Sequence, residues 1–274
     1  MFKHTIPALV AAAFFALSPV AATTQSLTSL DDIAKVSVLP GWRTSQGTHM
    51  AAIRIEMAEG WKTYWRRAGE SGITPRFDWS ASSNLEKVEI HWPTPKVFDP
   101  DTSRSYGYKG VLIIPVELTP TQSNSGPIAV RARMDIGVCE DICVPMSVDL
   151  QADLPNSGDI DPAITASLEH RPTSASQAGL RSATCTVEPI SDGLRVSAEL
   201  NLPKQGGDEV VVFEVSDQSI WIDEAQSSRK GRNLTAVTEL VPPNGQPFLL
   251  AGSDIRMTVF GKNGAVDVQG CTTG

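Results

Sequence analysis

The sequence predicts an all-β fold made of two β-sandwich domains joined by a short helix and a linker. Three observations lead to this prediction. Short runs alternate between apolar and polar residues, clusters of Pro and Gly separate these runs at hairpin-like intervals, and one segment breaks the pattern with a helical spacing. Many short strands punctuated by turn residues are typical of a sandwich or a barrel.

The strands are predicted from the pattern of apolar residues. Residues 51–57, 87–92 and 192–203 alternate with a period of two, which places their apolar side chains on one face of a strand. In the first of these runs the apolar face consists of Ala51, Ile53, Ile55 and Met57. Residues 111–118 and 209–215 are more continuously apolar, so we expect them to be central strands of their sheets.

The helical segment lies between the two groups of strands. Asp161 is a suitable N-cap, and Pro162 fits the first helical position. Ile164 and Leu168 lie four residues apart on one face, and Pro172 ends the helix before a polar stretch. The predicted divisions are therefore a first domain at 26–157, a helix and linker at 158–179, and a second domain at 180–274.

The first 22 residues are predicted to be a secretory signal peptide. A short basic start precedes an apolar run from Ile6 to Leu17, and Val20 and Ala22 supply small residues before a cleavage site. The run is short for a membrane span, so an uncleaved N-terminal anchor is the less favoured alternative, and no later segment has about eighteen consecutive apolar residues. We therefore expect a soluble protein of the bacterial periplasm with no membrane segment after cleavage. That compartment is oxidising, so disulfides persist there.

The charge and the motifs of the chain disfavour several classes of function. The net charge is −8 and the pI is near 5.0, which argues against nucleic acid as a partner. The nucleophile elbow of the α/β-hydrolases is absent from the sequence. His49, His91 and His170 are isolated, so we interpret them as surface or packing residues.

The four cysteines of the mature chain divide into two predicted disulfides. Three pairings are open in principle, and the domain boundary favours Cys139 with Cys143 and Cys185 with Cys271. The long loop closed by the second pair would stabilise the fold by about 4.5 kcal/mol in a chain-entropy treatment. The same treatment gives about 2 kcal/mol for the small ring of the first pair. Stability is therefore a weak reason for the first pair.

The strand register places the small ring on an unusual face. The apolar face consists of Val130, Ala132, Met134, Ile136 and Val138 before Cys139, and of Val144, Met146, Val148 and Leu150 after Cys143. Both cysteines fall on the opposite face. A three-residue loop joins the two strands as a hairpin, in which flanking residues have Cβ atoms roughly 5 Å apart, near disulfide distance. The disulfide is therefore predicted at the hairpin tip, off the core, where another protein reaches it.

The residues alone leave two readings of this hairpin open. Exposed disulfides are the labile ones, which favours exchange with a partner. Glu140 and Asp141 disfavour a thiolate, and Arg133 is about 20 Å away along an extended strand, so the pair is better suited to attack by a partner's thiolate. The alternative is an inert hairpin clip.

Two alternative interpretations of the site are binding functions. Cys139, Cys143 and Met146 together offer two thiolates and a thioether, which suit Cu(I), although Met146 falls on the core face. Zinc would need further ligands that are not visible nearby. An aromatic set could form a sugar-binding platform, although such residues are more often packing residues: Trp61, Tyr64, Trp65, Trp79 and Trp92.

Three stretches together resemble a known family. The segments are "GVCEDICVP" around the hairpin cysteines, "EGWKTYWRRAGESGITP" at 59–75 and "SYGYKGVLIIPVEL" at 105–118. They are similar to the periplasmic N-terminal domain of the thiol:disulfide interchange protein DsbD, and still more to the related domain of the suppressor-of-copper-sensitivity membrane proteins. The resemblance covers most of the first domain and, less distinctly, the second.

The resemblance implies an immunoglobulin-like sandwich whose hairpin cysteines exchange disulfides without a cofactor. By match, Cys139 and Cys143 would be the redox pair of a thiol–disulfide oxidoreductase component. The structural role of the Cys185–Cys271 disulfide rests instead on its long loop. The implied surroundings of the active site are Tyr64, Trp65, Tyr106, Gly107, Tyr108 and Pro145. In the family a cap loop with an aromatic residue shields the pair. Ser105 occupies the nearest position here, so Tyr106 or Tyr108 is expected to substitute.

The partners implied by the resemblance are a thioredoxin-fold periplasmic protein or a membrane electron carrier. The family passes electrons from such a donor to periplasmic oxidoreductases. This sequence ends after the second domain, without a membrane bundle or a C-x-x-C thioredoxin-like domain. We therefore expect the donor to be a separate protein. The alternative function is an envelope protein that binds Cu(I), as in copper tolerance, or a redox partner, without turnover.

Overall fold

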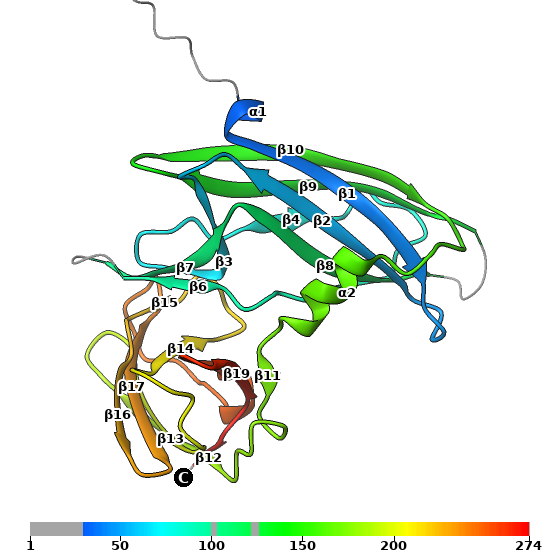
Figure 1. The fold of residues 1–274 in the computed structure, drawn as a ribbon. Coiled ribbons are helices and arrows are strands. Elements are labelled where there is room, and N and C mark those ends of the chain that lie inside the picture. The colour runs from blue at the N-terminus through cyan, green and yellow to red at the C-terminus, as the bar shows by residue number, and fades with distance from the viewer. Residues whose placement is uncertain (1–29, 100–102, 122–125, 274) are drawn as a thin grey trace, which may run out of the picture.

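The computed structural model describes residues 30–99, 103–121 and 126–273 and folds them into four β-sheets (Figure 1). The predicted signal peptide lies outside the described residues. Within them, no helix has the length and apolar character needed to cross a membrane. The chain is mostly strand, as the sequence predicts.

The first sandwich is built from the first two sheets. One sheet has the order β1-β2-β8-β5, with strands β1 (Ala34–Arg43), β2 (His49–Met57), β8 (Val111–Thr119) and β5 (Lys87–Ile90). The other has the order β10-β9-β3-β7-β6, with strands β10 (Cys143–Leu154), β9 (Ile128–Cys139), β3 (Lys62–Gly69), β7 (Ser105–Lys109) and β6 (Lys96–Phe98). The short strand β4 (Arg76–Asp78) also pairs with β9, and a short helix α1 (Leu30–Ile33) precedes β1.

The second sandwich is built from the other two sheets. One has the order β11-β19-β18-β14, with strands β11 (Thr173–Ser174), β19 (Gly264–Gln269), β18 (Arg256–Gly261) and β14 (Val210–Glu214). The other has the order β15-β17-β13-β12-β20, with strands β15 (Trp221–Ile222), β17 (Asn233–Val241), β13 (Leu194–Asn201), β12 (Ala183–Pro189) and β20 (Thr272–Thr273). Strand β16 (Gln226–Lys230) also pairs with β17, and a 3₁₀ turn η1 (Gly252–Asp254) precedes β18.

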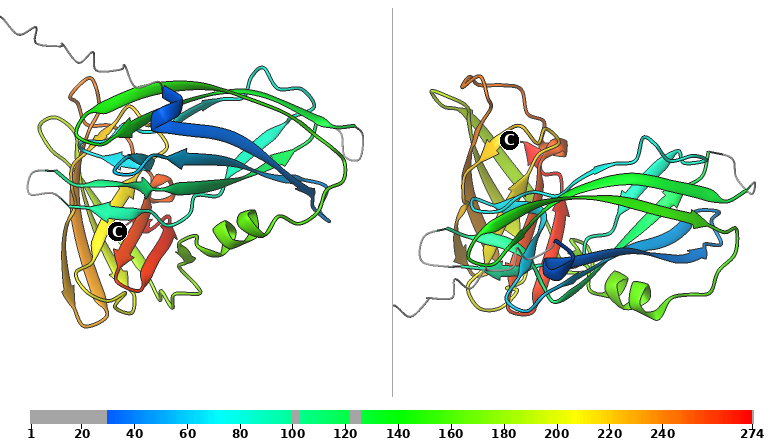
Figure 2. Two further views of the ribbon diagram at one scale, coloured as in Figure 1. Left: turned by 45° about the horizontal axis from the view of Figure 1, so that its top comes forward. Right: turned by 90° about the horizontal axis from the view of Figure 1, so that it is seen from above.

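These two sandwiches confirm the predicted fold class. Figures 1 and 2 show the strands of the second sandwich running across the direction of those of the first. The strands of the first sandwich lie within 34–154, and those of the second within 173–273. The domain boundaries given above remain predictions of the sequence.

Helix α2 (Pro162–Glu169) lies between the sandwiches and forms as its sequence predicts. The Asp161 carboxylate accepts hydrogen bonds from the backbone N–H groups of Ala163 and Ile164, at 2.7 and 3.3 Å. Ile164 is fully buried against strands β2 and β8. The polar stretch after the helix differs from the predicted linker, because β11 pairs in parallel with β19 and so joins the second sandwich.

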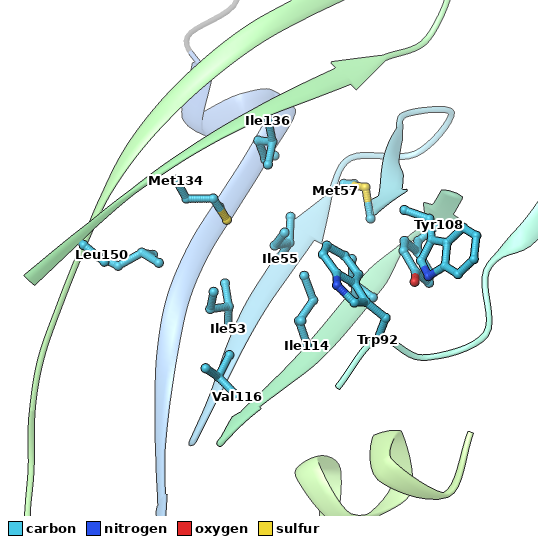
Figure 3. Packing of buried hydrophobic residues seen from close by; sticks show 14 of the residues in the cluster. Ile53, Ile55, Met57, Trp92, Tyr108, Ile114, Val116, Met134, Ile136 and Leu150 are labelled. Carbon is cyan, nitrogen blue, oxygen red and sulfur yellow. The ribbon is translucent and has the colours of Figure 1, made fainter. Parts of the chain in front are cut away.

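The core of the first sandwich forms from the alternating faces of its strands. Figure 3 shows Ile53 and Ile55 of β2 and Ile114 of β8 facing Met134 and Ile136 of β9. All of these side chains are buried. Period-2 alternation therefore determines which face of each strand becomes core.

Strand β14 is the exception among the predicted central strands. The run at 111–118 does lie centrally as β8, between β2 and β5, but β14 is at the edge of its sheet. Its apolar residues are nevertheless buried on both faces. Val211 and Phe213 pack in the core of the second sandwich, whereas Val212 packs against the core of the first. A continuously apolar strand therefore reflects two cores that meet here, rather than a central position.

The interface between the sandwiches combines aromatic packing with an ion pair. The Phe260 ring of β18 lies 5.5 Å from the Trp65 ring and 5.6 Å from the Tyr106 ring, measured between centroids. Beside it, the Arg66 guanidinium makes two hydrogen bonds of 2.8 and 2.9 Å to the Glu214 carboxylate. The Arg66 and Glu214 side chains are 14% and 15% exposed. Such a bidentate pair fixes orientation as well as distance.

The second sandwich is closed by its own disulfide. Cys185 lies in β12 and Cys271 just before β20, and their Cα atoms are 5.7 Å apart. The bond spans 86 residues of sequence, and Cys185 is buried in the core of this sandwich. The predicted pairing is confirmed.

Stability measurements test the expected difference between the two disulfides. Replacing Cys185 and Cys271 by Ser should lower the free energy of unfolding by about 4.5 kcal/mol, because the loop is long. The matched double variant of Cys139 and Cys143 should lose about 2 kcal/mol. Urea unfolding of both variants beside the unchanged protein gives the two values. A larger loss of unfolding free energy in the Cys139 and Cys143 variant would mean that the small ring contributes more to stability than the Cys185–Cys271 disulfide.

Candidate functional site

The hairpin of β9 and β10 carries the candidate site at its tip. The two strands pair without a break from Ile128 opposite Leu154 to Cys139 opposite Cys143. The three-residue loop is closed by the Glu140 N–H, which donates to the carbonyl of Ile142 at 3.1 Å. The cysteines form a disulfide, with Cα atoms 4.1 Å apart. The predicted hairpin and pairing are both confirmed.

The register sends the cysteines to the face away from the main core, as predicted. The alternate residues of β9, including Met134 and Ile136, point into the core. In β10, Met146 is likewise buried in the core at 5% exposure. Met146 therefore faces away from the two sulfurs, so the predicted Cu(I) ligand set is divided between two faces of the hairpin.

The two cysteines differ sharply in exposure. Cys143 is exposed, whereas Cys139 is 1% exposed. A separate small apolar cluster covers Cys139, and it consists of Tyr64, Ala68 and Ile73. We call these three residues the covering cluster. The prediction of an accessible disulfide is therefore correct for Cys143 and wrong for Cys139. The reason is that a second apolar layer lies over this end of the sheet's outer face, the face that points away from the main core.

Ile73 reaches this position because the chain folds back after β3. Strand β4 returns to pair with β9, so the segment between β3 and β4 crosses the outer face. Ile73 then packs directly on the backbone of Gly137. A Cβ atom at Gly137 would lie 2.6 Å from the Cβ of Ile73, which is closer than side chains pack. Gly137 is therefore needed for the covering cluster to form.

Tyr64 joins the covering cluster to the exposed sulfur. Its hydroxyl oxygen lies 3.5 Å from Cys143 Sγ. A disulfide sulfur has no proton to give, so the hydroxyl is the donor of this contact. Burial raises the pKa of Tyr64, which keeps the phenol protonated at neutral pH. Tyr64 is therefore placed to donate a proton or a hydrogen bond to Cys143.

Two other predicted neighbours lie on the same face as the cysteines. Gly107 of β7 is opposite Tyr64, and a Cβ there would collide with the carbonyl of Thr63. Pro145 is exposed and lies two residues after Cys143 in β10, opposite Gly137. No large side chain rises from either position beside Tyr64 and Cys143, because Gly107 has no side chain and that of Pro145 is short.

Three predicted neighbours lie elsewhere, which corrects the expectation of a tyrosine cap. Trp65, Tyr106 and Tyr108 are all buried in the main core. Tyr106 stacks on Phe260 of the second sandwich, and the Tyr108 hydroxyl donates to the carbonyl of Pro93 at 2.7 Å. Successive residues of a strand point to opposite faces, so these side chains cannot share a face with Tyr64 and Gly107.

The aromatic set also fails to form an exposed platform. Tyr64, Trp65 and Trp92 are buried. Trp61 and Trp79 are partly buried and pack against the main core. The packing interpretation of these residues is therefore correct. Over the described ranges, no group of three or more His, Cys, Asp or Glu residues is arranged to hold a metal ion.

Sequence reasoning missed two features of this site. Ile73 was not recognised as a cover, and Lys62 was not recognised as a neighbour of Cys139. Lys62 shares a face with Tyr64 by period-2 alternation, which is a signal present in the sequence. Lys62 and Cys139 are 77 positions apart in the chain (139 − 62), and the adjacency of β3 and β9 that pairs them has no local signature in the sequence.

Comparison with known proteins places this site in a family. Residues 25–155 match the family of the thiol:disulfide interchange protein DsbD, N-terminal. Among solved structures, the N-terminal periplasmic domain of ScsB from Proteus mirabilis aligns with a TM-score of 0.67 and 20% sequence identity, over 90% of this chain and 97% of that one. That likeness extends the shared fold across both sandwiches.

A second solved structure aligns over a smaller part of the chain. The reduced form of the Neisseria meningitidis DsbD N-terminal domain covers 45% of this chain and 86% of its own, with 17% identity and a TM-score of 0.27. No curated protein matches the sequence.

Selective reduction tests the different exposure of the two disulfides. Under mild reductant, Cys139 and Cys143 should open before Cys185 and Cys271, because Cys143 is exposed whereas Cys185 is 1% exposed. Alkylation at timed intervals, followed by peptide mapping, identifies the order. Labelling of Cys185 and Cys271 first would contradict the assignment of the hairpin as the labile bond.

Proposed function

Because residues 25–155 belong to the family of the N-terminal domain of the thiol:disulfide interchange protein DsbD, we propose that this protein exchanges disulfides with other proteins through Cys139 and Cys143. The exchange is a transfer of a disulfide between the hairpin pair and a partner's pair of thiols. It needs no cofactor, because the bond that opens and the bond that forms are both S–S bonds.

The observation that carries this proposal is the unequal exposure of the two sulfurs. Cys143 is exposed at the hairpin tip, and Ile142 beside it is 69% exposed. An attacking thiolate approaches one sulfur of a disulfide and releases the other. The burial of Cys139 supports Cys143 as the sulfur that bonds to the partner and Cys139 as the sulfur that is released.

The inert clip explains this arrangement less well. A ring of this size stabilises a fold by only about 2 kcal/mol, and the continuous pairing of β9 and β10 already holds the hairpin. A clip also gives no reason for a tyrosine hydroxyl aimed at the exposed sulfur. The division of Met146 from the cysteines likewise removes the thioether that favoured Cu(I).

We propose further that the protein works in the periplasm and takes electrons from a redox partner. Candidate donors are a membrane electron carrier or a thioredoxin-fold protein, and the acceptors are periplasmic oxidoreductases. The family supports this role, and the predicted signal peptide supports the compartment. A thioredoxin-fold partner suits the site because it supplies the low-pKa thiolate that attacks Cys143.

Trapping of a mixed disulfide tests this function. The Cys139→Ser variant keeps the exposed Cys143 and lacks the thiol that resolves a mixed disulfide. It should therefore accumulate a covalent complex with a thioredoxin-fold or membrane protein in cells, and that complex should disappear on reduction. Non-reducing gels and mass spectrometry of the excised band identify the partner.

The matched control is Cys143→Ser, which keeps only the covered Cys139. It should trap far less of the same complex. Equal trapping by both variants would contradict the assignment of Cys143 as the attacked sulfur. Absence of a complex with either variant, in cells that contain the partners, would leave the hairpin as a clip and overturn the proposed function.

A further inference from the structure

A row of two sulfurs and two cations crosses the outer face of the sheet. Cys143 of β10 is opposite Cys139 of β9, Cys139 is opposite Lys62 of β3, and Lys62 is opposite Lys109 of β7. Residues directly opposite each other on neighbouring strands project to the same face. We call these four residues the lysine–cysteine row. Its members come from strands spread along 62–143 of the chain.

The two lysines of the row lie close together beside one aromatic ring. Lys62 Nζ is 4.9 Å from the centroid of the Phe98 ring, and Lys109 Nζ is 5.8 Å from it. Lys62 is half-buried and donates to the Ser105 hydroxyl at 3.3 Å. Like charges on directly opposed residues destabilise a sheet. Burial and the nearby Lys109 charge together lower the pKa of Lys62.

No carboxylate relieves this repulsion among the residues that the structure describes. Neither lysine of the row forms an ion pair there. Three acids lie near the row along the chain: Glu59, three residues before Lys62, is exposed, Glu140 folds its carboxylate against Gly60, and Asp141 is exposed at the loop. Lys96 of β6, opposite Gly107, adds a further positive charge to this face. The two lysines of the row therefore repel each other without an ion-pair partner among the described residues.

We propose that Lys62 stabilises the thiolate that forms on Cys139 when the hairpin disulfide opens. The inference rests on the exchange reaction proposed above and adds a positioning residue to it. Lys62 is the cation of the row next to Cys139, and its flexible four-carbon arm allows the ammonium to move toward a new negative charge.

The step that Lys62 assists is the release of the second sulfur. A partner's thiolate attacks Cys143 Sγ and forms a new S–S bond with it. The Cys139–Cys143 bond breaks, and its electron pair leaves on Cys139 Sγ as a thiolate. No electrons are gained or lost overall, because one S–S bond replaces another. The reverse step begins with the same Cys139 thiolate.

A cation is needed at this point because Cys139 is covered. Apolar burial raises the pKa of a thiol and makes its thiolate a poor leaving group. When the flexible Lys62 arm turns from Ser105 toward the sulfur, it brings a positive charge near the new thiolate, and such a charge within about 4–6 Å lowers the pKa of an acidic group by roughly 1–3 units. Lys62 thus compensates for the covering cluster, and the thiolate in turn relieves the repulsion between the two lysines.

Titration of a single thiol tests this proposal directly. In a Cys143→Ser background, Cys139 is the one hairpin thiol, and the ultraviolet absorbance of its thiolate follows its pKa. Adding Lys62→Met should raise this pKa by about one pH unit or more, because the neighbouring charge is lost. Lys62→Arg keeps the charge and should leave the pKa near its starting value. Lys109→Met, one strand further away, should raise it less.

A rate measurement on the intact disulfide provides the second readout. Lys62→Met should slow reduction of the Cys139–Cys143 bond by dithiothreitol at neutral pH several-fold, and Lys62→Arg should not. In the Cys143→Ser protein with Lys62 intact, high salt should raise the Cys139 pKa by screening the charge, which needs no substitution at Lys62. A Cys139 pKa that stays constant or falls in Lys62→Met, or an effect that Lys62→Arg fails to rescue, would overturn the proposal.

These measurements are independent of any protein partner. A null result here with successful trapping in cells would remove the role of Lys62 and leave the exchange function intact. A raised pKa without a trapped complex would confirm the electrostatic effect but remove its proposed use in exchange.

Discussion

The register of the β9–β10 hairpin is the constraint on which the site depends. Because residues pair in sequence from Ile128 and Leu154 to the tip, the alternation of apolar residues commits one face to the core. The two cysteines therefore have to project from the other face. A shift of the pairing by one residue would bury the cysteines in the main core and expose Met134 and Ile136. The long apolar stretch of the hairpin thus stabilises the position of a bond that contributes little stability itself.

The other residues around the two cysteines on the outer face come from parts of the chain that are distant in sequence. The segment after β3 covers Cys139 with Ile73, and Gly137 has no side chain at the point where this cover touches the sheet. Strand β3 supplies Tyr64, whose hydroxyl contacts Cys143, and Lys62, which is directly opposite Cys139 in the sheet. One sulfur is accessible, and the other is enclosed and belongs to a residue directly opposite a lysine. In the proposed exchange, this asymmetry favours attack on Cys143 and release of Cys139, because the two sulfurs differ in access.

The second sandwich supports the site from behind rather than contributing to it. Phe260 packs against Trp65 and Tyr106, whose neighbours in β3 and β7 form the outer face. The paired Arg66 and Glu214 fix the orientation of this contact. The second sandwich therefore packs against the core-facing side of β3 and β7, the two strands that hold Lys62, Tyr64 and Gly107 on their other face. In β14 the two cores also meet directly, because Val212 packs against the core of the first sandwich while Val211 and Phe213 pack in that of the second.

The sequence by itself determined the alternating strands, the helix, the hairpin and the hairpin disulfide, because each depends on local information. The Cys185–Cys271 pairing, which spans 86 residues, followed from the domain boundary. Alternation fixes faces, Asp161 and Pro162 fix the start of a helix, and the register of "GVCEDICVP" fixes the face of the cysteines. The family resemblance came from the same local stretches. Only the tertiary structure decided which sulfur is exposed, that the tyrosines of β7 turn away from it, and that Lys62 is a neighbour of Cys139. Those facts depend on which strands lie side by side and on how a connecting segment folds back, and the period of a single strand contains no information about either.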